Sequence, residues 1–95
     1  MIYVIKQFRK KDINELWSCG GSNAGYFLDF EEAKKRVENN SLDLCENGYY
    51  HYTAIMEFEE GLYNPATNEA WYEWKEDGYK PCDRPEELAH IAFCV

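Results

Sequence analysis

The chain has 95 residues, a formal net charge of −8 at pH 7, and a hydrophobic content of 45%. This length predicts a single domain, residues 1–95, which is too small to enclose a deep, water-excluded active site easily. The hydrophobic content excludes a disordered chain, and no apolar run is long enough to predict a membrane-spanning helix.

The first predicted element is a strand at residues 2–9, where apolar side chains occupy both alternating faces. That pattern predicts an interior position in a sheet. A polar turn at residues 9–12 leads to a second predicted strand at residues 14–19, antiparallel to the first. The glycine-rich segment Gly20–Gly25 then predicts a break in regular structure before a helix.

The helix is predicted from its capping residues. Asp29 is a good N-cap, and Glu32 three positions later completes a capping box. Leu28 is expected to pack against Ala33 as a hydrophobic staple. The apolar face contains Phe30, Ala33 and Val37, and the helix is expected to end at Asn39-Asn40.

Three more strands are predicted in the second half of the chain, at residues 49–58, 70–75 and 91–95. A turn at Asp77-Gly78 and a short helical turn beginning at Pro85 separate the last two. The predicted fold class is α+β. One main helix packs on a mostly antiparallel sheet of about five strands, in the order β-β-α-β-β-β.

The charge is distributed unevenly along the chain. Residues 1–36 carry seven basic and five acidic groups, whereas residues 37–95 carry three basic and thirteen acidic groups, a net charge of −10. The acidic half is expected to repel nucleic acid and anionic membranes and to attract a basic protein surface.

Cysteine and histidine spacing gives no recognisable metal site. The chain starts without the apolar core of a signal peptide, so we expect a cytoplasmic protein with reduced thiols. The four cysteines are Cys19, Cys45, Cys82 and Cys94. Cys82, His90 and Cys94 are the candidate set for a metal, but their spacing matches no zinc signature.

Catalytic motifs are missing as well. Gly25 is followed by Tyr26 rather than by the Lys-Ser/Thr of a phosphate-binding loop, and no Gly-x-Ser-x-Gly elbow occurs. We therefore expect no enzyme activity and no cofactor. The cations Lys6, Arg9, Lys10 and Lys11 are interpreted as the solvated end of a hairpin rather than as a phosphate site.

Large aromatic rings alternate with acids in the second half of the chain. Tyr72 and Trp74 share one strand face and Trp71 takes the other, so at least one ring is expected outside the helix-packed core, where it could contact a partner. The predicted partner-binding residues are Glu57, Glu59, Tyr63, Trp71, Glu73, Trp74 and Glu76. Carboxylates two residues apart lie roughly 7 Å from each other, so mimicry of nucleic acid and a merely solvated acidic surface both stay open.

A family resemblance follows from short motifs within residues 26–93. They are Phe30-Glu31-Glu32-Ala33, Val37-Glu38-Asn39-Asn40, Asp43-Leu44, Tyr49-Tyr50, Gly61-Leu62-Tyr63, Trp71-Tyr72-x-Trp74 and Pro85-Glu86. The chain resembles an uncharacterised family of short acidic proteins from gut-type Firmicutes and their mobile elements. This resemblance implies no activity, cofactor or catalytic residue. A looser analogy, carried by size and charge alone, is to phage anti-defence proteins such as anti-CRISPR inhibitors.

The leading hypothesis is a small, non-enzymatic, acidic interaction module that binds a basic protein surface, with inhibition of a nucleic-acid-handling enzyme as one form of it. The alternative is a small-molecule-binding or regulatory domain with an aromatic-lined pocket between helix and sheet. A minor enzyme using Cys or His is the third. The sequence determines neither the partner nor the oligomeric state.

Overall fold

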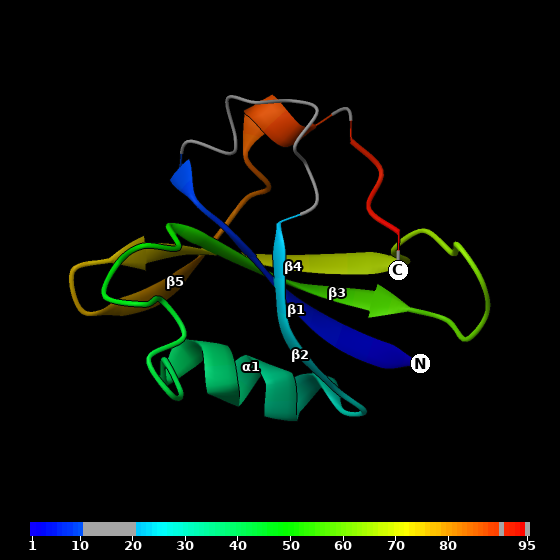
Figure 1. Ribbon diagram of the computed structural model, residues 1–95, viewed down its shortest axis with the longest axis horizontal. Helices are drawn as coiled ribbons and strands as arrows, with labels where there is room; N and C mark the ends of the chain where they lie inside the picture. The colour runs from blue at the N-terminus through cyan, green and yellow to red at the C-terminus, as the bar shows by residue number, and fades with distance from the viewer. Residues whose placement is uncertain (11–20, 90, 95) are drawn as a thin grey trace.

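The computed structural model describes residues 1–10, 21–89 and 91–94, which contain one antiparallel sheet with strand order β2-β1-β3-β4-β5. Its elements are β1 (Ile2–Phe8), β2 (Ser22–Phe27), α1 (Phe30–Glu38), β3 (Tyr52–Phe58), β4 (Asn68–Lys75), β5 (Gly78–Cys82) and the short 3-10 helix η2 (Glu86–Leu88). Figure 1 shows α1 along one face of the sheet and η2 with the C-terminal segment over the other. The predicted α+β class and β-β-α-β-β-β order are confirmed.

β1 lies inside the sheet, as predicted, because it pairs with β2 on one side and β3 on the other. Ile5 and Phe8 point to opposite faces, and their exposed fractions are only 3% and 1%. A strand that buries apolar side chains on both faces must have packed layers above and below it.

β2 occupies the segment that the glycine-rich composition predicted to be irregular, so that prediction is wrong for residues 22–25. Pairing with β1 overrides the weak strand preference of Asn23 and Gly25, since strand propensity depends strongly on context. A glycine is nevertheless required at the entry to β2. Gly21 has φ +61°, and a Cβ atom there would lie 2.8 Å from the carbonyl oxygen of Gln7. The strand predicted at residues 14–19 lies outside the described residues.

α1 follows its predicted capping signals closely. The Asp29 carboxylate accepts a hydrogen bond from the Glu32 backbone N–H at 3.1 Å, and Asn39 caps the C-terminus. Ala33 and Val37 are fully buried against the sheet. The predicted hydrophobic staple is wrong, because Leu28 is 75% exposed instead of packing against the helix.

The sheet separates two apolar cores. The helix-side core contains Ile5, Ala33, Val37, Cys45, Ile55, Tyr72 and Tyr79. The far-side core contains Phe8, Ala54, Met56, Phe58, Trp71, Leu88 and Phe93. Leu88 of η2 and Phe93 belong to the segment that covers the far side of the sheet, which is why one helix suffices for a sheet buried on both faces.

The last strand differs in place from its prediction. The fifth strand is β5, which pairs with β4 through a tight turn at residues 76–77, and not residues 91–95. Within residues 91–94 the structure shows only an isolated bridge between Cys94 and Pro65. The sequence did not predict β5 because this segment contains Pro81, and proline in a strand is tolerated mainly at an outer edge. The segment that contains Phe93 instead covers the sheet, because the Phe93 side chain packs in the far-side core.

Candidate partner-binding surface

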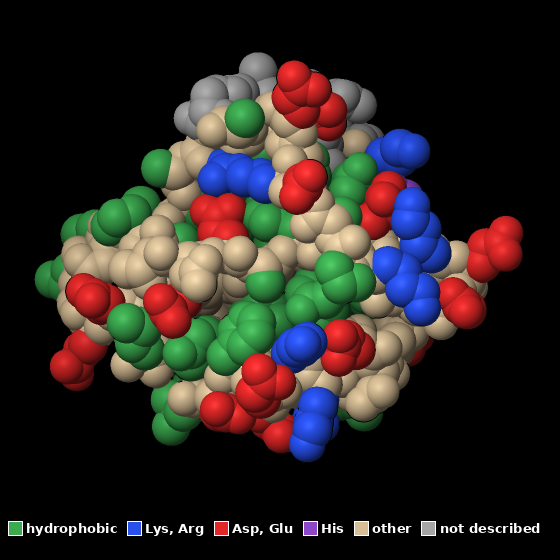
Figure 2. Space-filling model, turned by 180° about the vertical axis from the view of Figure 1, so that it is seen from behind, with side chains coloured by type: hydrophobic (Ala, Val, Ile, Leu, Met, Phe, Trp, Pro, Cys, Tyr) green, Lys and Arg blue, Asp and Glu red, His purple; other side chains and the backbone are tan. Residues whose placement is uncertain are grey.

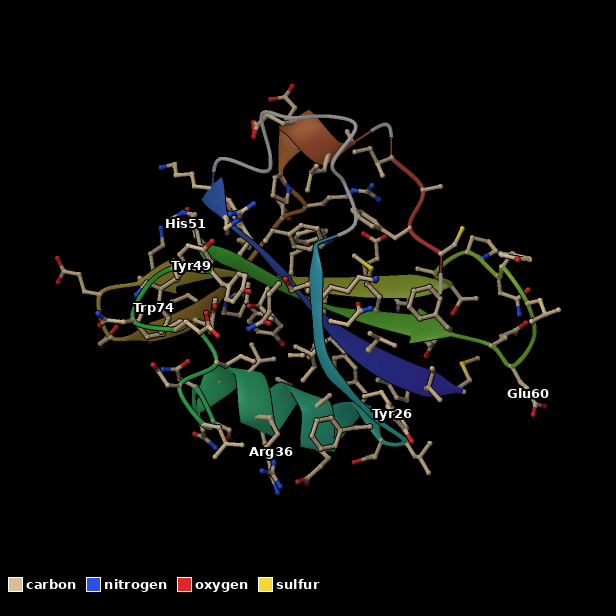
Figure 3. The ribbon with its side chains drawn as sticks, in the orientation of Figure 1. Tyr26, Arg36, Tyr49, His51, Glu60 and Trp74 are labelled. Carbon is tan, nitrogen blue, oxygen red and sulfur yellow. The ribbon has the colours of Figure 1, made fainter. Side chains whose placement is uncertain are left out.

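The predicted partner-binding residues lie at two opposite ends of the sheet. Glu57 pairs in register with Asn68 at one end, whereas Glu73 pairs with Tyr52 at the other. Five residues along a strand span roughly 16 Å. Figure 3 shows Glu60 at the first end, and His51 and Trp74 at the second. The predicted residues therefore cannot all belong to one small, continuous partner-binding patch.

Trp71 contributes little of its surface to any contact. It is 5% exposed, its ring centroid lies 5.1 Å from that of Phe8, and its indole N–H donates to the Glu69 carboxylate at 2.9 Å. The expected ring outside the helix-side core does exist, but it fills the far-side core instead of facing solvent. The C-terminal segment that supplies Phe93 covers it.

Trp74 also packs within the molecule. Its ring meets the edge of Tyr79 at a centroid distance of 5.1 Å, and it lies partly buried on the helix side of the sheet. Glu76 is exposed in the β4–β5 turn, close in sequence to Lys75. Neither Trp74 nor Glu76 therefore forms an apolar projection that a partner could enclose.

The first end, which we call the acidic end, has a different character. Its members are Met1, Leu28, Glu57, Glu59, Glu60, Leu62 and Tyr63. The exposed fractions of Leu62 and Tyr63 are 84% and 83%, and that of Leu28 is 75%. In Figure 2, hydrophobic and acidic side chains stand together at the end that carries the β3–β4 loop, and the basic side chains lie away from it.

A groove of about 470 Å³ runs through the acidic end. It is lined by Met1, Ile2, Leu28, Glu59, Glu60 and Gly61, among which there is no lysine or arginine. Exposed apolar side chains around a recess are typical of protein interfaces. Of this set, the sequence identified Glu57, Glu59 and Tyr63 and missed the others. Leu62 precedes Tyr63 in a turn, and two large apolar side chains there were the signal that could have identified Leu62 as exposed.

The β3–β4 loop is held by its own hydrogen bonds. The Asn64 side-chain amide donates to the carbonyl oxygens of Glu59 and Glu60 at 3.1 and 3.0 Å. The Thr67 hydroxyl donates to the Glu57 carboxylate at 2.6 Å. A loop that is ordered before binding loses less conformational entropy when a partner docks. Leu62 and Tyr63 are thus presented on a braced turn.

The opposite end holds a small polar cluster. Glu73 lies 2.8 Å from His51 Nε2 and 2.9 Å from Lys75 Nζ. The hydrogen bonds from Lys75 and then from His51 lower the pKa of the Glu73 carboxyl. Burial raises the pKa of the nearby Cys82 thiol, which favours the unreactive protonated form. Since nucleophilic catalysis by cysteine needs the thiolate, these electrostatics fit a structural cluster better than a catalytic pair.

The sequence interpretation of the cations at the start of the chain is wrong for Lys6, whereas Lys10 is exposed as that interpretation expected. Lys6 is only 7% exposed and donates to the Asn23 side chain at 2.9 Å. Arg9 donates to the Tyr49 hydroxyl at 2.8 Å. Lys11 lies outside the described residues.

The part of the chain that the structure describes contains neither a metal-binding group of side chains nor a membrane-spanning helix. Cys45, Cys82 and Cys94 are free thiols, and no group of His, Cys, Asp and Glu side chains there could hold a metal ion. His90 of the candidate metal set lies outside that part. No helix among the described residues is long and apolar enough to cross a membrane.

Comparisons with known proteins add no assignment. No protein-family model matches the chain, and no curated protein or solved structure is similar enough to count as a match. The resemblance to short acidic proteins of mobile elements therefore stays a hypothesis.

Proposed function

We propose that the protein is a non-enzymatic binding module that docks its acidic end on a basic protein surface. The observation that carries this proposal is the exposure of Leu62 and Tyr63, each above 80%, beside Glu59 and Glu60. Tyrosine is enriched among the residues that dominate binding energy, and surrounding charges fix orientation and speed encounter.

The overall charge supports a basic partner. A net charge of −8 on 95 residues attracts cationic surfaces over distances set by ionic strength. Enzymes that handle nucleic acids carry such surfaces, because they must bind phosphates. Inhibition of one of these enzymes is the form of the proposal that we favour, in the cytoplasm, where the exposed thiol of Cys94 would stay reduced.

The alternative of a small-molecule site has weaker support. Between α1 and the sheet, Tyr3, Phe30 and Glu57 line a recess of about 140 Å³. Ligand pockets usually enclose about 300–1,000 Å³. Two further aromatic rings on the helix side, Tyr72 and Tyr79, are buried in packing with Ile5 and Val37. This recess is large enough for a fragment or a few waters, and we favour the protein-binding function.

The proposal is tested by capture of partners from the native host. Immobilised wild-type chain is compared with a Leu62→Ser/Tyr63→Ser double variant, and retained proteins are identified by mass spectrometry. Both side chains are largely exposed, so the fold should survive, which circular dichroism checks. A matched double variant at the opposite end, Glu76→Gln/Asp77→Asn, serves as the control.

We expect a protein with a basic surface that is retained by the wild type and the control but not by the Leu62/Tyr63 variant. Equal retention by all three chains would contradict the proposed surface. Loss of retention in the Glu76/Asp77 variant alone would move the binding site to the β4–β5 turn.

A further inference from the structure

β2 is an outer strand of the sheet that the described residues form, and no described strand pairs with its outer edge. Among the described strands it pairs only with β1, and every residue from Gly21 to Tyr26 is exposed. An outer strand presents unpaired N–H and C=O groups, which are a template for another strand. Proteins that remain single copies usually block such an edge with charge, proline or a covering segment.

The two outer strands are treated differently. β5 carries Lys80 and Pro81, and both are residues that oppose the addition of a further strand. Residues 20–28 around β2 include no charged residue and no proline. The blocked edge is therefore at β5, and the edge at β2 lacks both devices.

Hollows flank β2 on both faces of the sheet. On the far side, Ile2, Val4 and Phe58 contribute to a hollow of about 310 Å³ beside residues 23–26. On the helix side, Ile5 and Leu44 contribute to one of about 160 Å³. A strand added at the edge would direct alternate side chains to these two faces.

Projections stand beside the hollows. Tyr26, labelled on β2 in Figure 3, is 64% exposed and borders both hollows. Leu42 borders the helix-side hollow and is 99% exposed. Its loop is held by Asn40, whose side-chain oxygen accepts from the Cys45 N–H at 2.8 Å. One surface thus contains both projecting and recessed apolar features.

We propose that two copies of the chain pair antiparallel through β2, which would join two five-stranded sheets into one continuous sheet. A twofold interface uses the same surface on both copies, so that surface must supply both projection and recess. The β2 edge supplies Tyr26 and Leu42 as projections and the two hollows as recesses. This inference does not depend on the proposed function, because none of Glu59, Glu60, Leu62 and Tyr63 borders the two hollows beside β2.

Charge opposes a second copy less at this edge than at β3, β4 or β5. The elements nearest β2, which are β1 and α1, carry together with it four basic and three acidic side chains, a net of +1. The acidic residues 37–95 supply β3, β4 and β5, which lie progressively farther from β2. Pairing through β2 would separate the two β4 strands by seven strand spacings, about 34 Å. That distance is several times the Debye length of about 8 Å at physiological salt.

The paired segment is short. The register between β1 and β2 shifts after Ile5, where Ala24 is left without a partner residue. A bulge of this kind limits how far a new ladder can extend. We therefore expect a weak dimer, as the short paired segment implies.

The test is analytical ultracentrifugation of the purified chain from about 5 to about 500 µM. We expect a mass that rises from 11.3 kDa toward twice that value. Tyr26→Lys is expected to raise the dimer dissociation constant about tenfold or more, because it adds a cation on each copy beside Lys6 and Arg36, which line the two hollows. The matched control is Leu62→Lys, an equal change of charge at a side chain that is still more exposed and lies at the acidic end.

Hydrogen exchange of the wild type keeps the proposal testable even if Tyr26→Lys folds poorly. Backbone amides in residues 22–27 should exchange more slowly at the higher concentration, while those of β5 should not change. A chain that stays monomeric throughout overturns the proposal, including the case in which β2 captures an extended peptide from another protein. It is overturned equally by a dimer without slowed exchange in β2, or by one that Leu62→Lys weakens as much as Tyr26→Lys does.

Discussion

The guanidinium group of Arg84 donates to both carboxylate oxygens of Glu69, with Nη1–Oε2 and Nη1–Oε1 distances of 3.1 and 3.3 Å. Its other terminal nitrogen donates to the backbone carbonyl oxygens of Leu88 and Ile91. The group also lies 4.9 Å from the centroid of the Phe93 ring. A single side chain thus fastens the C-terminal segment to β4 and closes the far-side core.

Replacing Arg84 with alanine should therefore destabilise the fold strongly. The Glu69 carboxylate, whose side chain is 20% exposed, would lose its cation, and the carbonyl oxygens of Leu88 and Ile91 would each lose the hydrogen bond from the guanidinium group. We expect the free energy of unfolding to fall by about 2–4 kcal/mol, measured by guanidinium chloride denaturation.

Arg36→Ala is the matched control, because the Arg36–Glu32 pair on α1 is exposed. Its loss should cost about 0.5 kcal/mol or less. Similar losses in the two variants would show that Arg84 does not hold the C-terminal segment as described.

The two glycines around β2 give opposite predictions. Gly21→Ala should lower the free energy of unfolding by at least about 1–3 kcal/mol, because φ is +61° and the new Cβ would collide with Gln7 O and the Phe8 ring. Gly25→Ala should be neutral or slightly stabilising, since no atom lies within 4 Å of the position of its Cβ. Thermal unfolding of both variants at low protein concentration decides the point. A tolerated Gly21→Ala would contradict the close approach of β2 to Phe8.

Stability at alkaline pH should depend on Tyr79. Burial raises the pKa of its hydroxyl from 10.0 to about 12, and the hydroxyl donates to the Tyr50 carbonyl oxygen at 2.7 Å. The folded state therefore keeps this proton more tightly than the unfolded state. The resulting stabilisation is complete below about pH 10 and is lost as the pH rises toward about 12.

Tyr79→Phe isolates this contribution. By pH 11 the wild type should have lost about 1 kcal/mol through this group, and the variant should lose that much less between pH 8 and pH 11. Burial also raises the pKa of Tyr52 and Tyr72, but these groups titrate in both chains. Denaturation curves at the two pH values measure the difference. Equal losses in the two chains would mean that the Tyr79 hydroxyl is not held in its neutral form.

The parts of the fold that sequence reasoning identified correctly depend on local signals. Asp29 and Glu32 define the start of α1 through a hydrogen bond between neighbours in the chain. The alternation in residues 52–58 similarly places Ile55 and Met56 on opposite faces. Such patterns need no knowledge of distant residues.

The errors in the predicted strands arise where pairing with a distant segment determines the local structure. β2 forms because it pairs with β1, and no residue pattern within Ser22–Phe27 predicts a strand. β5 follows β4 through the hairpin turn despite Pro81. Trp71 is buried by Phe93, which lies 22 positions farther along the chain, so its burial could not be read from its own strand.

The candidate surface was predicted only in part, for the same reason. The sequence grouped Tyr63 with Glu57 and Glu59, and the structure places all three at the end of the sheet that carries the β3–β4 loop. Met1 and Leu28 join them only because β1 and the start of α1 meet the β3–β4 loop at one end of the sheet. Glu73 and Trp74 were grouped with them by sequence distance, although the strand direction carries them to the other end.

The central claim, that the acidic end binds a basic partner, is tested most directly by the salt dependence of association with the captured partner. Surface plasmon resonance would compare the wild type with Glu59→Gln/Glu60→Gln and with the control Glu76→Gln/Asp77→Asn. We predict an association rate that falls as salt rises, and a Glu59/Glu60 variant that associates several-fold more slowly and responds less to salt, with the control close to wild type. Association that is indifferent to salt, or equally slowed in both variants, would contradict the claim.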